Sequence, residues 1–242
     1  MKINNKKISS QKDVDDINSL VDIYRAHKKL YELFLKSVES DFSSDPSLNS
    51  GTPTILHSTK CRLKDDAHLA DKIRRKRAEG RTINAENILS SITDFAGLRV
   101  IHLYQNQFEN IHKLIKSKIK SKSWRFLEKP LAYTWDPDSV NYFKKFNLRT
   151  SVKSSFYTSV HYVIAPANDE AGISCEIQVR TLFEEAWGEI DHSINYPQPT
   201  KVMANIEQLR VLSRLVSTGS RLADSIFKVH NESLKIGNQP IL

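Results

Sequence analysis

The segment 174–196 constrains the fold more than any other part of the chain, because its hydrophobic period changes within a few residues. In its first part polar and aliphatic side chains alternate, which is typical of a strand with one face in a core. From Phe183 onward apolar residues recur every three or four positions, which indicates an amphipathic helix directly after the strand. The polar face of the strand carries Glu176, Gln178 and Arg180. Such a face predicts either a solvated edge strand or the floor of a site that holds a charged ligand.

Composition narrows the class of protein. The chain has 242 residues, 39% of them hydrophobic, which fits one large domain or one domain with a helical extension. No apolar run has the length of a membrane span, and the first residues lack the apolar core of a signal peptide. Two cysteines provide neither a disulfide framework nor a zinc spacing, so a reducing cytoplasm is expected. The net charge of +8 indicates an anionic partner.

Periodicity alternates between helix and strand along the chain, which predicts an α/β protein. The pattern predicts helices near 13–38, 65–79, 88–92, 108–119, 183–194 and 206–226, and strands near 54–57, 98–104, 124–127, 157–165 and 174–180. Residues 128–153 are expected to be an irregular, aromatic-rich loop, which at this length is usually functional or mobile. Gly219 is expected to interrupt the last helix.

Charged residues stand out in two places, between the predicted strands at 54–57 and 98–104 and on the strand at 98–104 itself. Arg62, Lys64, Lys72 and Lys76 lie within or near one helix, and the two latter are four residues apart, so they share a face. They predict either a solvated basic helix or cations that converge on a polyanion. Arg99 lies on a mostly apolar strand, where an unpaired charge costs several kcal/mol.

Four short motifs follow one another in order. They are Arg62-Leu-Lys64, Asp94-Phe-Ala-Gly97-Leu-Arg99, Lys153-Ser-Ser-Phe-Tyr157-Thr-Ser159-Val-His161 and Glu176-Ile-Gln178-Val-Arg180-Thr181. One motif alone carries little weight, but four in this order are rarely obtained by chance. Residues 55–197 thereby resemble the synthetase domain of the RelA/SpoT family, the (p)ppGpp synthetases. The resemblance implies a nucleotidyltransferase-like mixed sheet flanked by helices, in a small stand-alone synthetase.

The resemblance also implies the reaction, which moves pyrophosphate from ATP to the 3′-hydroxyl of GDP or GTP and releases AMP. On the donor side it places Arg62 and Arg99 on either side of the adenine and brings three lysines to the phosphates: Lys64, Lys72 and Lys76. It assigns Mg²⁺ to Asp94 and Glu176, which suits a hard cation that takes one or two carboxylates plus phosphate oxygens. Glu176 is also the candidate for orienting or deprotonating the attacking hydroxyl.

On the acceptor side the resemblance implies that Tyr157 stacks on guanine. The neighbouring residues expected at the acceptor phosphates or the site wall are Lys153, His161, Gln178 and Arg180. The chain departs from the family pattern in Phe156, where glycine is common before the tyrosine, and in Glu185, where small synthetases often carry asparagine near the guanine. An acid there can accept hydrogen bonds from the guanine N1–H and N2–H groups.

Two other functions compete with this hypothesis. A relative that pyrophosphorylates the 3′ end of tRNA would suit the lysine run at 113–122, although the intact Lys153, Tyr157 and His161 set favours a free nucleotide. A catalytically inactive nucleotide- or RNA-binding module is disfavoured because both carboxylates are present. The expected organisation is an N-terminal helix and linker (1–53), a synthetase domain (54–197) and a C-terminal helical extension (198–242), through which a homo-oligomer can form.

Overall fold

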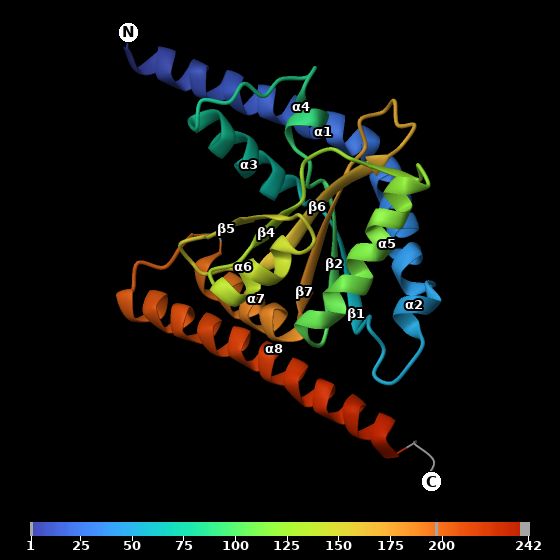
Figure 1. Cartoon of the computed structure of the whole chain (residues 1–242). Helices are drawn as coiled ribbons and strands as arrows, with labels where there is room; N and C mark the ends of the chain where they lie inside the picture. The colour runs from blue at the N-terminus through green and yellow to red at the C-terminus, as the bar shows by residue number, and fades with distance from the viewer. Residues whose placement is uncertain (1, 197, 238–242) are drawn as a thin grey trace.

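A mixed seven-stranded sheet forms the centre of the molecule (Figure 1). The structure, a computed structural model, describes residues 2–196 and 198–237, with side chains from residue 15 to residue 234 within those ranges. The strands are β1 (Ser58–Leu63), β2 (Ala96–His102), β3 (Trp124–Phe126), β4 (Leu131–Tyr133), β5 (Arg149–Ser151), β6 (Ser159–Pro166) and β7 (Cys175–Thr181). Their order is β1-β2-β7-β6-β4-β5, and β3 also pairs with β6. The α/β fold expected from the sequence is therefore confirmed.

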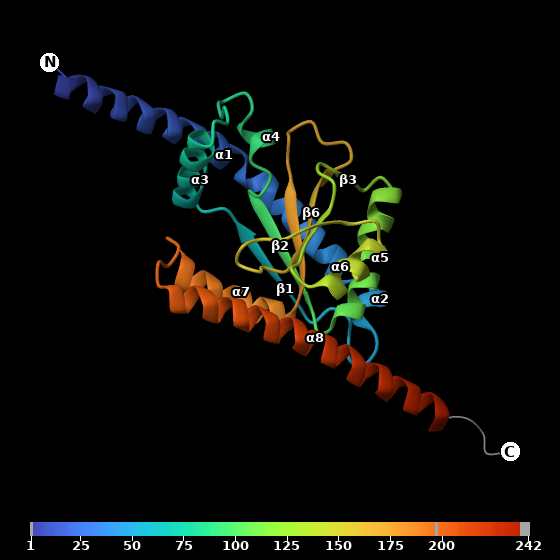
Figure 2. The same cartoon turned by 60° about the vertical axis from the view of Figure 1, so that its left-hand side comes forward.

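The helices surround this sheet. They are α1 (Lys2–Ser43), α2 (Pro46–Asn49), α3 (Asp66–Ala78), α4 (Ile88–Ser91), the 3₁₀ turn η1 (Gln105–Gln107), α5 (Phe108–Lys120), α6 (Pro137–Lys144), α7 (Leu182–Asn195) and α8 (Met203–Gly237). α1 runs behind the sheet and its N-terminal part projects past α3, while α8 crosses one end of the sheet beside α7 (Figure 1, Figure 2). No helix of the described residues combines the length and hydropathy that a bilayer span requires.

One face of the sheet forms the core. The apolar residues of β7, namely Cys175, Ile177 and Val179, are at most 1% exposed and belong to one cluster with the inward side chains of α1 and α5. The polar residues of β7 therefore face the other side, because successive side chains of a strand alternate. The sequence pattern thus places Glu176, Gln178 and Arg180 on the face that the core leaves uncovered.

The prediction of a strand at 54–57 is wrong, because the chain at these residues turns and packs against α2. The backbone N–H groups of Ile55 and Leu56 both donate to the Leu48 carbonyl, at 3.0 Å each. The strand begins at Ser58 and contains Lys60 and Arg62, while Lys64 directly follows its last residue. Because β1 lies at the edge of the sheet and is mostly exposed, it has no need for apolar alternation, which explains why periodicity missed it.

Two further expectations are corrected. Residues 128–153 are not irregular throughout: they contain β4, β5 and α6, which begins at Pro137 after an Asp136 cap whose side chain accepts from the Ser139 N–H. Gly219 does not interrupt α8. A Cβ at this glycine would lie 3.0 Å from the Phe183 ring, so Gly219 allows α8 to pack closely against α7.

Candidate active site

The register of four strands brings the charged residues onto one face. Arg99 pairs with Lys60 of β1 on one side and with Gln178 of β7 on the other, and Gln178 pairs with His161 of β6. In the next row Arg62 and Glu176 both pair with Gly97. Residues that pair across neighbouring strands point to the same face of the sheet. The motifs recognised in the sequence therefore meet on one floor.

Asp94 lies immediately before β2 and binds two lysines. Its Oδ2 atom accepts from Lys64 Nζ at 2.8 Å, at the end of β1, and contacts Lys72 Nζ of α3 at 2.6 Å. Burial raises the pKa of Asp94, but the charges of Lys72 and Lys64 outweigh burial and hold the pKa at about 2. The buried Oδ1 atom has no hydrogen-bond partner among the described residues. This carboxylate is ionised and retains an oxygen for a ligand.

Glu176 is the second carboxylate of the floor. Its Oε1 atom lies 3.0 Å from His161 Nδ1, and its Oε2 atom accepts from Gln178 Nε2 at 2.6 Å. Burial raises the pKa of Glu176, and the contacts with His161 and Gln178 overcome that effect and bring the pKa to about 2. Asp94 acts in the opposite direction on the same pKa, which indicates that the two carboxylates lie within electrostatic reach of each other.

Asp94 and Glu176 are the residues that fit a metal ion. The described residues contain no cluster of three or more histidine, cysteine, aspartate or glutamate side chains with metal-binding geometry. A pair of carboxylates suits Mg²⁺, which takes few protein ligands and completes its octahedron with water and phosphate oxygens. The unpartnered Oδ1 atom of Asp94 provides one such ligand position.

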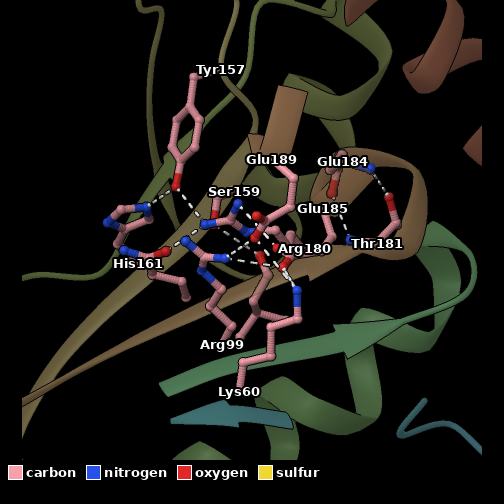
Figure 3. Close-up of polar contacts among 12 residues, drawn as sticks. Lys60, Arg99, Tyr157, Ser159, His161, Arg180, Thr181, Glu184, Glu185 and Glu189 are labelled. Atoms are coloured by element: carbon pink, nitrogen blue, oxygen red, sulfur yellow. Dashed lines mark hydrogen bonds and ion pairs between the residues drawn. The ribbon is translucent and has the colours of Figure 1, made fainter. Parts of the chain in front are cut away.

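Arg99 takes part in an ion-pair cluster above the floor (Figure 3). Its Nη1 atom lies 3.0 Å from Glu185 Oε1 and 2.5 Å from Glu189 Oε1, and Lys60 Nζ lies 2.7 Å from the same Glu185 oxygen. The other Glu185 oxygen is 3.4 Å from Arg180 Nη1. The Glu185 side chain is only 5% exposed, whereas that of Glu189 is 53% exposed. Glu185 thus points into the cluster, and its expected contact with the acceptor stays a prediction.

Tyr157 is the centre of a second group of side chains. Its hydroxyl lies 2.9 Å from His161 Nε2 and accepts from Arg180 Nη2 at 3.0 Å (Figure 3). Lys153 Nζ lies 4.4 Å from the centre of the Tyr157 ring and 4.1 Å from that of Tyr133. Arg180 also donates to the Gln178 amide oxygen. The structure therefore brings together the acceptor-side residues that the motifs predicted.

The guanidinium group of Arg180 packs against Gly188 of α7. A Cβ at Gly188 would lie 2.8 Å from Arg180 Nη1, so a larger residue there would displace the guanidinium group. α7 itself starts with a capping box, in which the Thr181 hydroxyl accepts from the Glu184 N–H while the Glu184 carboxylate accepts from the Thr181 N–H. The turn from β7 into α7 is thereby fixed directly beside the site.

The donor-side residues line a cavity of about 570 Å³. Its lining includes Arg62, Lys64, Lys72, Asp94, Arg99, Glu189, His192 and Tyr196. A second cavity of about 230 Å³ adjoins it through Arg62 and Arg99. Cavities of this size suit a nucleotide-sized ligand. Lys76 does not line either one, because its Nζ atom donates to the Ser91 carbonyl at 2.9 Å.

Sequence reasoning missed two residues of the site. Lys60 binds Glu185, and Tyr133 packs between Lys153 and His161, with ring centres of Tyr133 and His161 5.0 Å apart. Lys60 precedes Arg62 by two positions, so the period of a strand would have placed both on one face. Tyr133 belongs to a three-residue strand, which is too short for a periodic signal.

Comparisons with known proteins identify the family of this chain and several of its relatives. Residues 61–201 match the family model described as the region found in RelA/SpoT proteins. The GTP pyrophosphokinase YwaC of Bacillus subtilis (strain 168) is 24% identical over 191 residues, which is 76% of this chain and 80% of that protein.

Two solved structures show the same fold. One is small alarmone synthetase 1 from Bacillus subtilis, with a TM-score of 0.66 at 19% identity over 87% of this chain and 99% of that chain. The other is that enzyme bound to its product pppGpp, with a TM-score of 0.60 at 20% identity over 85% of this chain and 94% of that chain. Since the family model spans more than half of the sequence, the chain belongs to the RelA/SpoT family.

Proposed function

We propose that this protein is a (p)ppGpp synthetase, which transfers the pyrophosphoryl group of ATP to the 3′-hydroxyl of GDP or GTP. The observation that carries the proposal is the position of Asp94 and Glu176 on a floor between a cation-lined cavity and the Tyr157 group. Family membership supports it, as do the relative named GTP pyrophosphokinase and the similar structure that holds pppGpp. In chemical terms this is a GTP diphosphokinase.

ATP occupies the cavity of about 570 Å³. Arg62 and Arg99 border it, and their flat guanidinium groups suit the two faces of an adenine ring. Lys64 and Lys72 already converge on Asp94, so they are placed to bind the phosphates next to that carboxylate. Lys76 contributes less to binding of the ATP phosphates, because its ammonium group donates to the Ser91 carbonyl.

Asp94 and Glu176 would hold Mg²⁺, which supplies charge neutralisation at the β- and γ-phosphates. The 3′-oxygen of the acceptor attacks the β-phosphorus of ATP, and the bond from that phosphorus to the α,β-bridging oxygen breaks. AMP leaves with the bonding electron pair, and the hydroxyl proton is released to solvent. Glu176 orients the attacking hydroxyl. A carboxyl with a pKa of about 2 is a weak base, so orientation is favoured over storage of the proton.

The guanine of the acceptor stacks on Tyr157. Lys153 and His161 already contact this ring or its hydroxyl, so both lie where acceptor phosphates or ribose would arrive. Gln178 and Arg180 form the wall between the acceptor and the floor. Glu185 acts through Arg180 and Arg99, since it contacts a cation on each side.

The remaining expectations belong to the same proposal. Residues 54–197 form the catalytic unit, with helical segments before and after it, and the reaction takes place in the cytoplasm with ATP and guanosine nucleotides as partners. The outer face of α8 carries exposed apolar side chains at Val211, Leu215, Leu222, Ile226 and Val229. Such a face suits a homo-oligomer.

The test uses γ-³²P-labelled ATP and Mg²⁺ with GDP, GTP or deacylated tRNA as acceptor, followed by chromatographic separation of the products. The proposal expects label on the guanosine nucleotide and an equal amount of AMP. Label on tRNA alone would show that the protein is a tRNA pyrophosphotransferase. Binding of ATP without transfer to any acceptor would show that the protein is an inactive nucleotide-binding module.

A further inference from the structure

Phe156, directly before Tyr157, has an unusual backbone conformation. Its φ angle is +62°, in the left-handed region that bulky residues avoid. The residue closes a turn in which its N–H donates to the Lys153 carbonyl at 2.9 Å. A strained residue of this kind persists only when its surroundings hold it in place.

The surroundings that hold Phe156 come mainly from α8. The buried hydroxyl of Ser213 donates to the Phe156 carbonyl at 2.8 Å. The guanidinium groups of Arg210 and Arg214 lie 5.8 and 5.5 Å from the centre of the Phe156 ring. Trp135 stacks on the same ring, with ring centres 5.5 Å apart and planes inclined by 27°. Three side chains of one helix therefore clamp Phe156, the residue directly before the predicted guanine-stacking Tyr157.

A second contact extends the clamp to the start of the turn. Arg210 Nε donates to the Ser154 carbonyl at 3.3 Å. The turn of residues 153–156 is thus bound to α8 at two of its carbonyl groups, at Ser154 and Phe156. In contrast, the hydroxyl of Tyr157 is bound to His161 and Arg180 of the sheet and not to α8.

These contacts show whether α8 supports the acceptor site or blocks it. A helix that blocked the acceptor would engage the groups expected to bind it. α8 instead holds the Ser154 and Phe156 carbonyls and the Phe156 ring, while Lys153 Nζ lies over the rings of Tyr133 and Tyr157. The clamp fixes the backbone from which Lys153 and Tyr157 project.

We propose that α8 is a positioning element of the acceptor site, in which Ser213 and Arg214 hold Phe156 in its left-handed conformation and so present Lys153 and Tyr157 to the guanosine nucleotide. The inference rests on the proposed function for the identity of that nucleotide, but the clamp itself does not depend on it. α8 begins at Met203, just after the region matched by the family model, so the acceptor site is completed from outside that region.

The test compares the wild type with the double variant Ser213→Ala/Arg214→Ala and with Lys228→Ala, an exposed lysine further along α8, as a control. Hydrogen–deuterium exchange of a peptide covering residues 150–160 reports the order of the loop without any substrate. Dissociation constants for GDP and for ATP, each measured by calorimetry, report the two nucleotide sites separately. The double variant is expected to exchange this peptide faster and to bind GDP about tenfold more weakly, with ATP binding changed less than about twofold.

Phe156→Gly is the second variant. Glycine adopts a positive φ without strain but lacks the ring that Arg214 and Trp135 contact. It is expected to reproduce the faster exchange and the weaker GDP binding. Unchanged exchange and unchanged GDP affinity in both variants would overturn the proposal, as would tighter GDP binding, which would mean an obstructing helix.

The two proposals fail in different ways. If the wild type binds ATP but no guanosine nucleotide, the proposed function is wrong, and the exchange of residues 150–160 still decides whether α8 orders the loop. If the wild type binds both nucleotides and the variants behave like it, only the positioning role of α8 is wrong.

Discussion

The donor half and the acceptor half of the site differ in how their side chains are engaged. On the donor side Asp94, Lys64 and Lys72 border an open cavity of about 570 Å³, and Asp94 keeps an oxygen without a partner among the described residues. On the acceptor side Tyr157 and His161 bond to each other and to residues of β7. The side chains of both halves are therefore paired within the protein, and the donor half in addition borders a cavity of nucleotide size.

The ion-pair cluster of Glu185 lies between the two halves. Arg99 of the donor side and Arg180 of the acceptor side bind different oxygens of this carboxylate. Because both arginines contact the Glu185 carboxylate, a movement of one arginine changes the position of the carboxylate that the other arginine contacts. The comparison predicts that the carboxylates of the floor serve both halves, that Glu185 stabilises their junction, and that other residues act on one half only.

The largest effect is expected at the floor. Asp94→Asn and Glu176→Gln should each lower kcat on the order of 10³-fold, because the loss of one anionic ligand or of the hydroxyl's acceptor acts on the transition state. Circular dichroism and thermal unfolding should show that both variants remain folded. Turnover close to that of the wild type in either variant would contradict the assigned metal and orienting roles.

The next effect is on stability, at the junction. Glu185→Gln should lower the free energy of unfolding by about 3 kcal/mol, because the negative charge that three cations contact is removed and the buried Arg180 loses its ion pair with Glu185. Glu189→Gln, at a side chain that is 53% exposed, should cost at most about 1 kcal/mol. Denaturant unfolding measures both, and equal losses would mean that burial does not distinguish the two glutamates.

An effect confined to the acceptor half is expected at Tyr157. Tyr157→Ala should raise the KM for GDP roughly tenfold or more, since stacking of an aromatic ring on a base contributes about 1–3 kcal/mol. The KM for ATP should stay within about twofold, because Tyr157 does not line the donor cavity.

The matched variant in the donor half is Lys72→Met, with Arg74→Ala on the exposed side of the same helix as its control. Lys72→Met should raise the KM for ATP and leave that for GDP nearly unchanged. Steady-state kinetics with one substrate varied at a time separates the two constants. If Tyr157→Ala or Lys72→Met changed the KM for ATP and the KM for GDP equally, the two halves of the site would not be independent.

The sequence predicted the parts of the site that lie on long regular elements. The alternation around Glu176 placed its side chain on the polar face of a strand. The motif that contains Asp94 placed this residue just before the strand that became β2. It did not predict the clamp on Phe156, because that contact joins residues 57 positions apart. Nor did it predict that Glu185 is buried, since only the three-dimensional approach of Lys60, Arg99 and Arg180 compensates an acid there.

The smallest effect is a pH dependence of stability in the acceptor half. His102 is 3% exposed and lines a small cavity with Ser159 and Arg180. Burial lowers the pKa of His102 from 6.5 to about 4 in the folded state. Folding therefore favours the neutral imidazole, and its stabilising contribution is complete above pH 6.5 and is lost as the pH falls toward 4.

Linkage gives a loss of about 1 kcal/mol between pH 7 and pH 5.5 for such a shift. Asp94, with a pKa of about 2, adds nothing to this slope, because its contribution is lost only below the unfolded pKa near 4. His102→Asn retains a donor for the Tyr104 carbonyl and should remove this component of the pH dependence measured by urea unfolding. Glu184 lines the same cavity, and burial raises its pKa to about 7, so it contributes a slope of the opposite sign in both the wild type and the variant. His112, whose pKa is also lowered to about 4, keeps its own share. If the free energy of unfolding of His102→Asn depended on pH as that of the wild type does, protonation of His102 would not cause the loss of stability in acid. His112 would then be the residue to replace next.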